Sequence, residues 1–207
     1  MSKNIVITIS REFGSGGRYI GEMTAKKLDI PFYDKAIIEM ASDKTGFSSE
    51  YIKENEQKLT GSSLFNFAIT CSYAGNMVFG SGESLQDTMF FAQSNVIKEI
   101  ASKNSCVIVG RCANHVLEGM DNCINVFIYS DMNSKIKRAV SEYKLDSSNI
   151  EKILRERDKL RAKHYNYYTG KNWGDARNYH ICLNSDFIGA DNTVKIILDA
   201  VKSISDK

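Results

Sequence analysis

The sequence predicts an α/β fold in which a parallel β-sheet is flanked by helices, and three observations support this. Apolar runs of the kind that form buried parallel strands occur at 5–9, 106–109 and 124–129. Segments with helical spacing of apolar residues separate these runs, as in βαβ units. A glycine-rich segment joins the first strand to the first helix. We therefore expect ligands to bind at the carboxyl ends of the strands.

The remaining elements follow from the same patterns. A last short strand is expected at 179–183. Residues 60–84 are rich in Gly, Ser and Asn with scattered aromatics, which is typical of a mobile cover over a site. The segments with helical spacing are, in chain order, 20–28, 35–40, 84–100, 134–143, 150–163 and 194–201.

Composition and charge narrow the function classes. A chain of 207 residues suits one domain, and its net charge of +2 lacks the basic excess of a nucleic-acid-binding protein. Five cysteines without a C-x-x-C pair predict no disulfide framework and no zinc ribbon, and Cys112 with His115 gives too few ligands for a metal site. No apolar run is long enough to span a bilayer. We expect a cytoplasmic protein with no membrane partner.

Residues 10–18, here called the glycine loop, carry glycines at 14, 16 and 17 between the first strand and the first helix. Glycines let backbone N–H groups converge, and a helix N-terminus adds unpaired N–H groups and partial positive charge. Together these features favour a site for phosphate. The alternative is a tight turn without a ligand, for which one glycine would suffice.

The sequence from Val6 to Leu28 resembles the phosphate loop and first helix of cytidylate kinases. It is still more similar to their diverged relatives, the cytidylate kinase-like proteins, which share the S-R-E-x-G-S-G-G-R loop. The resemblance continues at 31–34, 107–111, 156–158 and 181–185. It implies a three-layer P-loop kinase-type fold forming one domain over 1–207, with a helical acceptor-side insert at about 40–85 and a basic lid at about 155–177.

The chain departs from this pattern where an ordinary phosphate loop, G-x-x-x-x-G-K-[ST], is charged. When the motif is aligned without gaps, Arg11 occupies the position of its first glycine. Gly17 occupies the position of the lysine, and Arg18 that of the magnesium-binding hydroxyl residue. Val109 and Cys112 stand where cytidylate kinases carry acids. Arg18 or Arg11 can supply the missing charge, and Ser15 or Ser10 a hydroxyl. We predict that Arg18 stands in for the lysine.

The predicted lid is basic between Lys152 and Arg177. Arg157 falls in line with the apolar stripe of its helix, so it is either a buried structural partner or a phosphate ligand. The resemblance favours a ligand, because Arg157 and Asp158 match the lid R-D pair, and Arg161 is the nearest candidate for a later lid arginine. The aromatic residues at 164–173 can stack on a base or pack the lid onto the body.

The resemblance implies transfer of the γ-phosphoryl group of ATP, with Mg²⁺, to a nucleoside monophosphate or similar small acceptor. The alternative is a non-catalytic sensor that binds a nucleotide or a phosphorylated metabolite through a degenerate loop. Asp34 matches an acceptor-side acid, although Lys35-Ala36 follow it in place of T-G. The predicted donor-phosphate ligands are Gly14, Ser15, Gly16, Gly17 and Arg18, the substrate-binding residues Asp34, Arg111 and Asp158, and the catalytic residues Arg18, Arg157 and Arg161, with no metal ligand assigned.

Overall fold

The computed structural model describes residues 4–45, 85–145 and 148–205. The chain divides into two compact units, which are Met1–Asp34 with Ile97–Lys207, and Lys35–Val96. The first unit contains a five-stranded parallel sheet in the order β2-β3-β1-β4-β5. Its strands are β1 Val6–Arg11, β2 Phe32–Tyr33, β3 Cys106–Val109, β4 Cys123–Tyr129 and β5 Ile181–Asn184. The predicted parallel α/β sheet is confirmed.

Strand β1 lies at the centre of this sheet. It pairs with β3 on one side and β4 on the other, and Ile9 is in register with both Val109 and Val126. After β1 the chain forms β2 and β3 on one side of it and then β4 and β5 on the other side. The carboxyl end of β1 is therefore a topological switch point. Open α/β sheets bind their ligands at such a point.

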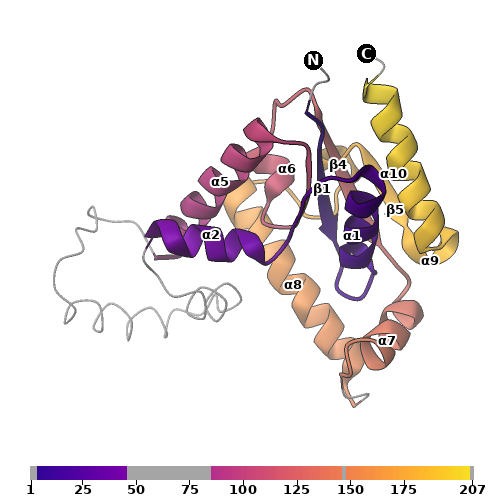
Figure 1. The fold of residues 1–207 in the computed structure, drawn as a ribbon. Helices are drawn as coiled ribbons and strands as arrows, with labels where there is room; N and C mark the ends of the chain where they lie inside the picture. Colours follow the sequence, from indigo (N-terminus) through magenta and orange to yellow (C-terminus); the bar gives the residue numbers. More distant parts are fainter. Residues whose placement is uncertain (1–3, 46–84, 146–147, 206–207) are drawn as a thin grey trace, which may run out of the picture. The chain divides into compact units, whose positions relative to one another are not determined.

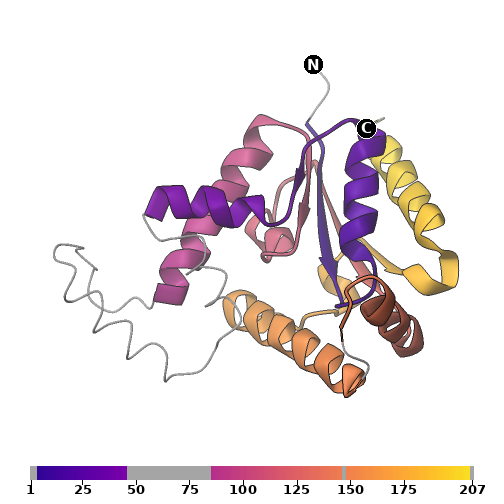
Figure 2. The ribbon, with the colours of Figure 1, turned by 60° about the horizontal axis from the view of Figure 1, so that its bottom comes forward.

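Helices cover both faces of the sheet in the first unit. Helices α1 and α10 lie together on one face, and α6 and α8 lie on the other (Figures 1 and 2). The helices that belong wholly to this unit are α1 Gly17–Leu28, α6 Ala113–Val116, α7 Met132–Ser141, α8 Ile150–Thr169, α9 Ser185–Ile188 and α10 Ala190–Ser205, with a 3₁₀ turn, η1, at Ala176–Asn178.

The core of the first unit explains why its strands are continuous apolar runs. All four residues of β3 are buried, and five of the six residues of β1 are buried. Ile7, Val109 and Ile128 pack with Ile20 of α1 and Ile197 of α10 in one apolar cluster. Burying such a side chain contributes about 1.5–3 kcal/mol. A strand buried on both faces cannot alternate polar and apolar residues.

The second unit contains α2 Ala36–Thr45 and the first part of α5 Leu85–Lys103, a helix that continues into the first unit. Ile37, Ala41 and Met89 are buried in this unit. The helices expected at 35–40 and from 84 onward are confirmed. The cover predicted at 60–84 and most of the insert predicted at about 40–85 lie outside the described residues.

Several predicted boundaries were wrong, and the helix expected at 134–143 is Met132–Ser141. The helix expected to end near residue 163 continues to Thr169 and ends at Gly170, whose φ is 66°. The last strand begins at Ile181 rather than Tyr179, because Tyr179 N donates to Ala176 O at 3.2 Å and closes the η1 turn. Among the helices described, no helix is long and apolar enough to cross a membrane.

The aromatic residues of the predicted lid pack onto the body at two positions. Tyr165 is buried in α8, and its hydroxyl accepts a hydrogen bond from Asn114 Nδ2 at 2.9 Å. The Trp173 ring meets Phe127 edge-on, with centroids 5.3 Å apart. The packing alternative therefore applies to Tyr165 and Trp173.

Candidate functional site

The glycine loop connects β1 to α1 at the switch point of the sheet. Gly14 and Gly16 have φ angles of 81° and 76°, which is the left-handed region that glycine adopts readily. The first hydrogen bond of the helix runs from Ile20 N to Gly16 O at 3.0 Å. The N–H groups of Gly17, Arg18 and Tyr19 precede that bond and lie at the positive end of the helix dipole. This geometry suits an anion.

A buried lysine that the sequence analysis missed stabilises the glycine loop through carboxylates. Lys135 of α7 is 5% exposed, and its Nζ lies 3.0 Å from both Glu12 Oε2 and Asp158 Oδ2. The other carboxylate oxygen of Asp158 accepts a hydrogen bond from Phe13 N at 2.6 Å. Asp158 therefore clamps α8 to the glycine loop through the loop's own backbone.

Arg138, one turn after Lys135 on α7, was also missed. Its Nη1 donates to Gly14 O at 2.6 Å. A Cβ on Gly14 would lie 3.1 Å from Lys135 O, and one on Gly16 would lie 3.3 Å from Arg138 Cζ. The loop therefore needs small residues where α7 approaches it. The signal in the sequence was a pair of cations one helical turn apart, in the helix that directly follows a buried strand.

Three arginines gather beside the loop at the carboxyl ends of β1 and β3. They line a cavity of about 60 Å³, here called the arginine cavity. Arg161 Nη1 donates to Arg11 O at 3.0 Å and lies 3.5 Å from Asp158 Oδ1. Arg11 Nη2 lies 3.8 Å from Asp34 Oδ1. The cavity is lined by Ser10, Arg11, Gly110, Arg111, Cys112, Arg161, His164, Tyr165 and Trp173.

The electrostatics of this cavity favour an anion. Burial lowers the pKa of Arg161 to about 9 and that of Arg111 to about 10, and in both cases the charge of Arg11 adds to the effect. Burial, with a smaller contribution from Arg111, lowers the pKa of His164 to about 4. The arginines stay charged at neutral pH, so several cations repel one another in a poorly solvated space. An anion in the cavity would relieve that repulsion.

The structure brings some of the predicted site residues together and separates others. Arg161 and Arg111 line the arginine cavity, and Asp34 pairs with Arg11 at its edge. Arg18 is turned toward Asp34, with Nε 3.0 Å from Oδ2. Arg157 is stacked on the Phe13 ring, with Cζ 4.4 Å from the centroid.

The residues around the loop do not offer the ligands that an ordinary phosphate loop gives to Mg²⁺. Arg18 replaces the hydroxyl, and Ser15 Oγ donates to Glu12 O at 2.9 Å. Asp34 and Asp158 are paired with cations. No group of three or more His, Cys, Asp or Glu among the described residues is placed to hold a metal ion. This donor set therefore does not fit the metal.

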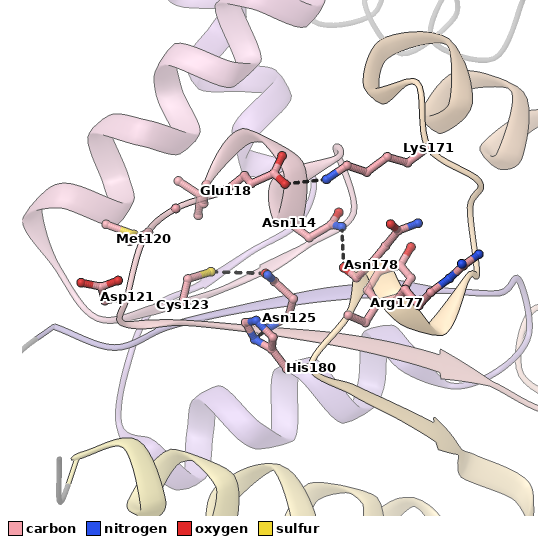
Figure 3. A pocket seen from close by; sticks show the side chains of 13 residues that line it. Asn114, Glu118, Met120, Asp121, Cys123, Asn125, Lys171, Arg177, Asn178 and His180 are labelled. Atoms are coloured by element: carbon pink, nitrogen blue, oxygen red, sulfur yellow. Dashed lines mark hydrogen bonds and ion pairs between the residues drawn. The ribbon is translucent and has the colours of Figure 1, made fainter.

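A second cavity, here called the basal cavity, is larger, at about 340 Å³ (Figure 3). Cys123 begins β4 and His180 precedes β5, so this cavity reaches the amino ends of those strands. On its rim Lys171 points toward Glu118, with Nζ 2.5 Å from Oε1 (Figure 3). Its position at the opposite ends of the strands from the glycine loop makes it a poor candidate for the phosphate site.

A parallel sheet with a glycine loop at its switch point, and cations gathered on that loop, defines a P-loop kinase-type protein. More particularly, the chain belongs to the cytidylate kinase-like family, whose model matches residues 6–187. The predicted family is therefore confirmed. A cytidylate kinase from Methanoregula boonei is 28% identical over 109 residues, which are 52% of this chain and 59% of that protein's length.

Solved structures agree with this fold. An uncharacterized protein from Eubacterium ventriosum is 28% identical, has a TM-score of 0.72, and the match covers 97% of this chain and 99% of that one. A shikimate kinase from Acinetobacter baumannii, solved with shikimate, is 17% identical with a TM-score of 0.56, over 98% of this chain and 95% of the other. At that identity the likeness to the shikimate kinase shows the fold alone.

Proposed function

We propose that this protein is a phosphotransferase that moves the γ-phosphoryl group of ATP to a nucleoside monophosphate or a similar small acceptor. The observation that carries the proposal is the arginine cavity, where Arg11, Arg111 and Arg161 converge beside the glycine loop. Phosphoryl transfer needs positioning and cationic stabilisation more than covalent chemistry from the protein.

The donor phosphates would lie against the N–H groups at the start of α1. Gly16 and Gly17 have no side chain and Ser15 Oγ donates to Glu12 O, so the contact to a phosphate would be made by backbone N–H groups. Arg161 reaches this region from α8, the helix that forms most of the proposed lid at about 155–177. It would stabilise the negative charge that develops on the transferred group.

The acceptor would bind toward β2 and β3. Arg111 follows the carboxyl end of β3, and a guanidinium there can hold an acceptor phosphate in bidentate fashion. Arg18 and Asp34 form an ion pair at 3.0 Å that would fix the carboxylate for an acceptor hydroxyl or amino group. Burial raises the pKa of the Cys112 thiol to about 12, so this thiol does not replace the missing acid.

A second candidate function is a sensor that binds the nucleotide without turnover. Gly17 stands at the position of the phosphate-loop lysine, and Arg18 at that of the magnesium hydroxyl. These are the substitutions that favour the sensor. Stabilisation by ATP without ADP release would support it.

The test is a coupled ADP-release assay over a panel of nucleoside monophosphates, run beside thermal unfolding with ATP and magnesium. Turnover that Arg161→Ala abolishes supports the phosphotransferase. Arg155→Ala is the matched control, because Arg155 lies on the same helix, is exposed and pairs with Glu151 at 2.7 Å. No turnover with any acceptor, together with stabilisation by ATP, would replace the phosphotransferase with the sensor.

A further inference from the structure

The backbone of the glycine loop does not explain why residue 17 is glycine. Gly14 and Gly16 adopt left-handed φ angles, whereas Gly17 does not and is the first residue of α1. An ordinary L-residue is compatible with helical φ and ψ at that position. The absence of a side chain at residue 17 must therefore have another cause.

That cause is Arg11. A Cβ on Gly17 would lie 2.6 Å from Arg11 Cβ and 3.0 Å from Arg11 Cγ. Arg11 Cβ is fixed by the backbone of β1, so no change of rotamer can move it away. Residue 17 must remain glycine as long as residue 11 carries any side chain.

Arg11 carries its charge from the end of β1, past Gly17, into the arginine cavity. Its side chain passes Gly17 and ends with Nη1 against Gly110 and Nη2 3.8 Å from Asp34 Oδ1. The side chain is 22% exposed and lines the arginine cavity. Arg18, in contrast, is 59% exposed and bonded to Asp34 through Nε.

We propose that Arg11 is the phosphate-binding cation of this loop. It supplies from the end of β1 the charge that a lysine at position 17 supplies in an ordinary phosphate loop, and Gly17 is the space that Arg11 requires. The ligand is the polyphosphate chain of a nucleoside triphosphate, an identification that rests on the proposed function. A guanidinium in this position can bind two phosphate oxygens at once, which a lysine cannot.

The steric requirement for glycine at residue 17 is tested without any ligand. Thermal unfolding of Gly17→Ala is measured in the native, Arg11→Gly and Arg11→Ala backgrounds. With Arg11 present, the added methyl should lower the melting temperature by about 5 °C or more. In Arg11→Gly the same change should be neutral. In Arg11→Ala it should still destabilise, because alanine keeps the Cβ that lies 2.6 Å away. Equal effects in all three backgrounds would overturn the claim that the Arg11 side chain is the reason for glycine at residue 17.

The role of Arg11 as the phosphate-binding cation is tested by the dissociation constant of inorganic tripolyphosphate. Arg11→Gly should weaken binding by roughly 10- to 100-fold, the size of a lost hydrogen bond to a charged group. Arg11→Gly with Gly17→Lys should recover binding to within about fivefold of the native value. Arg11→Ala with Gly17→Lys, which has the same new charge but keeps the clash, should not recover. Unchanged binding in Arg11→Gly, or no recovery in the glycine–lysine exchange, would overturn the proposal.

These measurements do not depend on turnover. A protein that binds tripolyphosphate with this pattern but releases no ADP refutes the proposed function and leaves the role of Arg11 intact. Arg155→Ala serves again as the control for loss of an arginine, and its dissociation constant should stay native. Loss of binding in that control as well would show a general charge effect and would also overturn the proposal.

Discussion

The arginine cavity and the basal cavity are both lined by cations, but these cations differ in how they are paired and how deeply they are buried. In the basal cavity, Lys171 meets Glu118 at 2.5 Å and both side chains are exposed to solvent. In the arginine cavity, Arg111 and Arg161 are crowded by Arg11, and burial lowers their pKa values. The basal cavity is the larger, at about 340 Å³ against about 60 Å³. Buried cations that repel one another, rather than size, therefore distinguish a candidate site from a surface hollow.

The largest effect should come from removing the cation that supports the glycine loop. Lys135→Met would leave the carboxylates of Glu12 and Asp158 partly buried without their shared partner. Breaking a buried pair in this way costs about 3–5 kcal/mol. Urea unfolding should show this loss, and a stability within about 1 kcal/mol of the native protein would contradict the buried network.

The next effect tests whether the crowded cations act on a phosphate. Arg161→Ala and Arg111→Ala should each lower the rate of ADP release by about 10²–10³-fold, the size of one lost stabilising donor. The same assay on Lys171→Ala should give the native rate, because Lys171 is paired with Glu118 in the basal cavity. Equal losses in both cavities would remove the distinction between them.

A smaller effect concerns pH. His164 lines the arginine cavity, and burial lowers its pKa to about 4, so the folded protein keeps this imidazole neutral. A group whose folded pKa lies below its unfolded value of about 6.5 stabilises the fold above that value. This contribution is lost as pH falls from 6.5 toward 4, and the loss should reach about 2 kcal/mol at pH 5.

His164→Gln provides the comparison for this pH effect. The glutamine variant should lose less stability than the native protein between pH 7 and pH 5, as measured by urea unfolding at each pH. Binding of tripolyphosphate in the cavity should also raise the pKa of His164 in an NMR titration, because an anion stabilises the imidazolium. A pKa that does not move on binding would place the anion elsewhere.

The smallest effect is expected in the basal cavity. Lys171→Ala removes an exposed ion pair, which contributes about 0–1 kcal/mol. Added salt should reduce the difference from the native protein further, because exposed charges are screened. A loss above about 2 kcal/mol in urea unfolding would mean that the Lys171–Glu118 pair is more than a surface contact.

The sequence by itself determined the parallel sheet, the glycine loop and the family. The sheet and the loop follow from local signals, which are the apolar runs at 5–9 and 106–109 and glycines placed between a strand and a helix. The family follows from the resemblance of the S-R-E-x-G-S-G-G-R loop and of the motifs after it. Buried strands must be continuously apolar, and a left-handed turn favours glycine, whatever surrounds them. The helices were found for the same reason, although the helix beginning at Ile150 extends further than its apolar stripe indicated.

Only the tertiary structure decided which charges meet the loop. Lys135 and Asp158 are far from the glycine loop in the sequence but bond to two adjacent residues of it, Glu12 and Phe13. The sequence offered Arg18 and Arg11 as substitutes for the lysine and favoured Arg18. In the structure Arg11 lines the cavity and Arg18 is exposed, although both pair with Asp34. The physical reason is that side-chain direction and solvation depend on what packs against a residue. Residue type fixes only the charge, and packing decides whether that charge is buried, paired or left for a ligand.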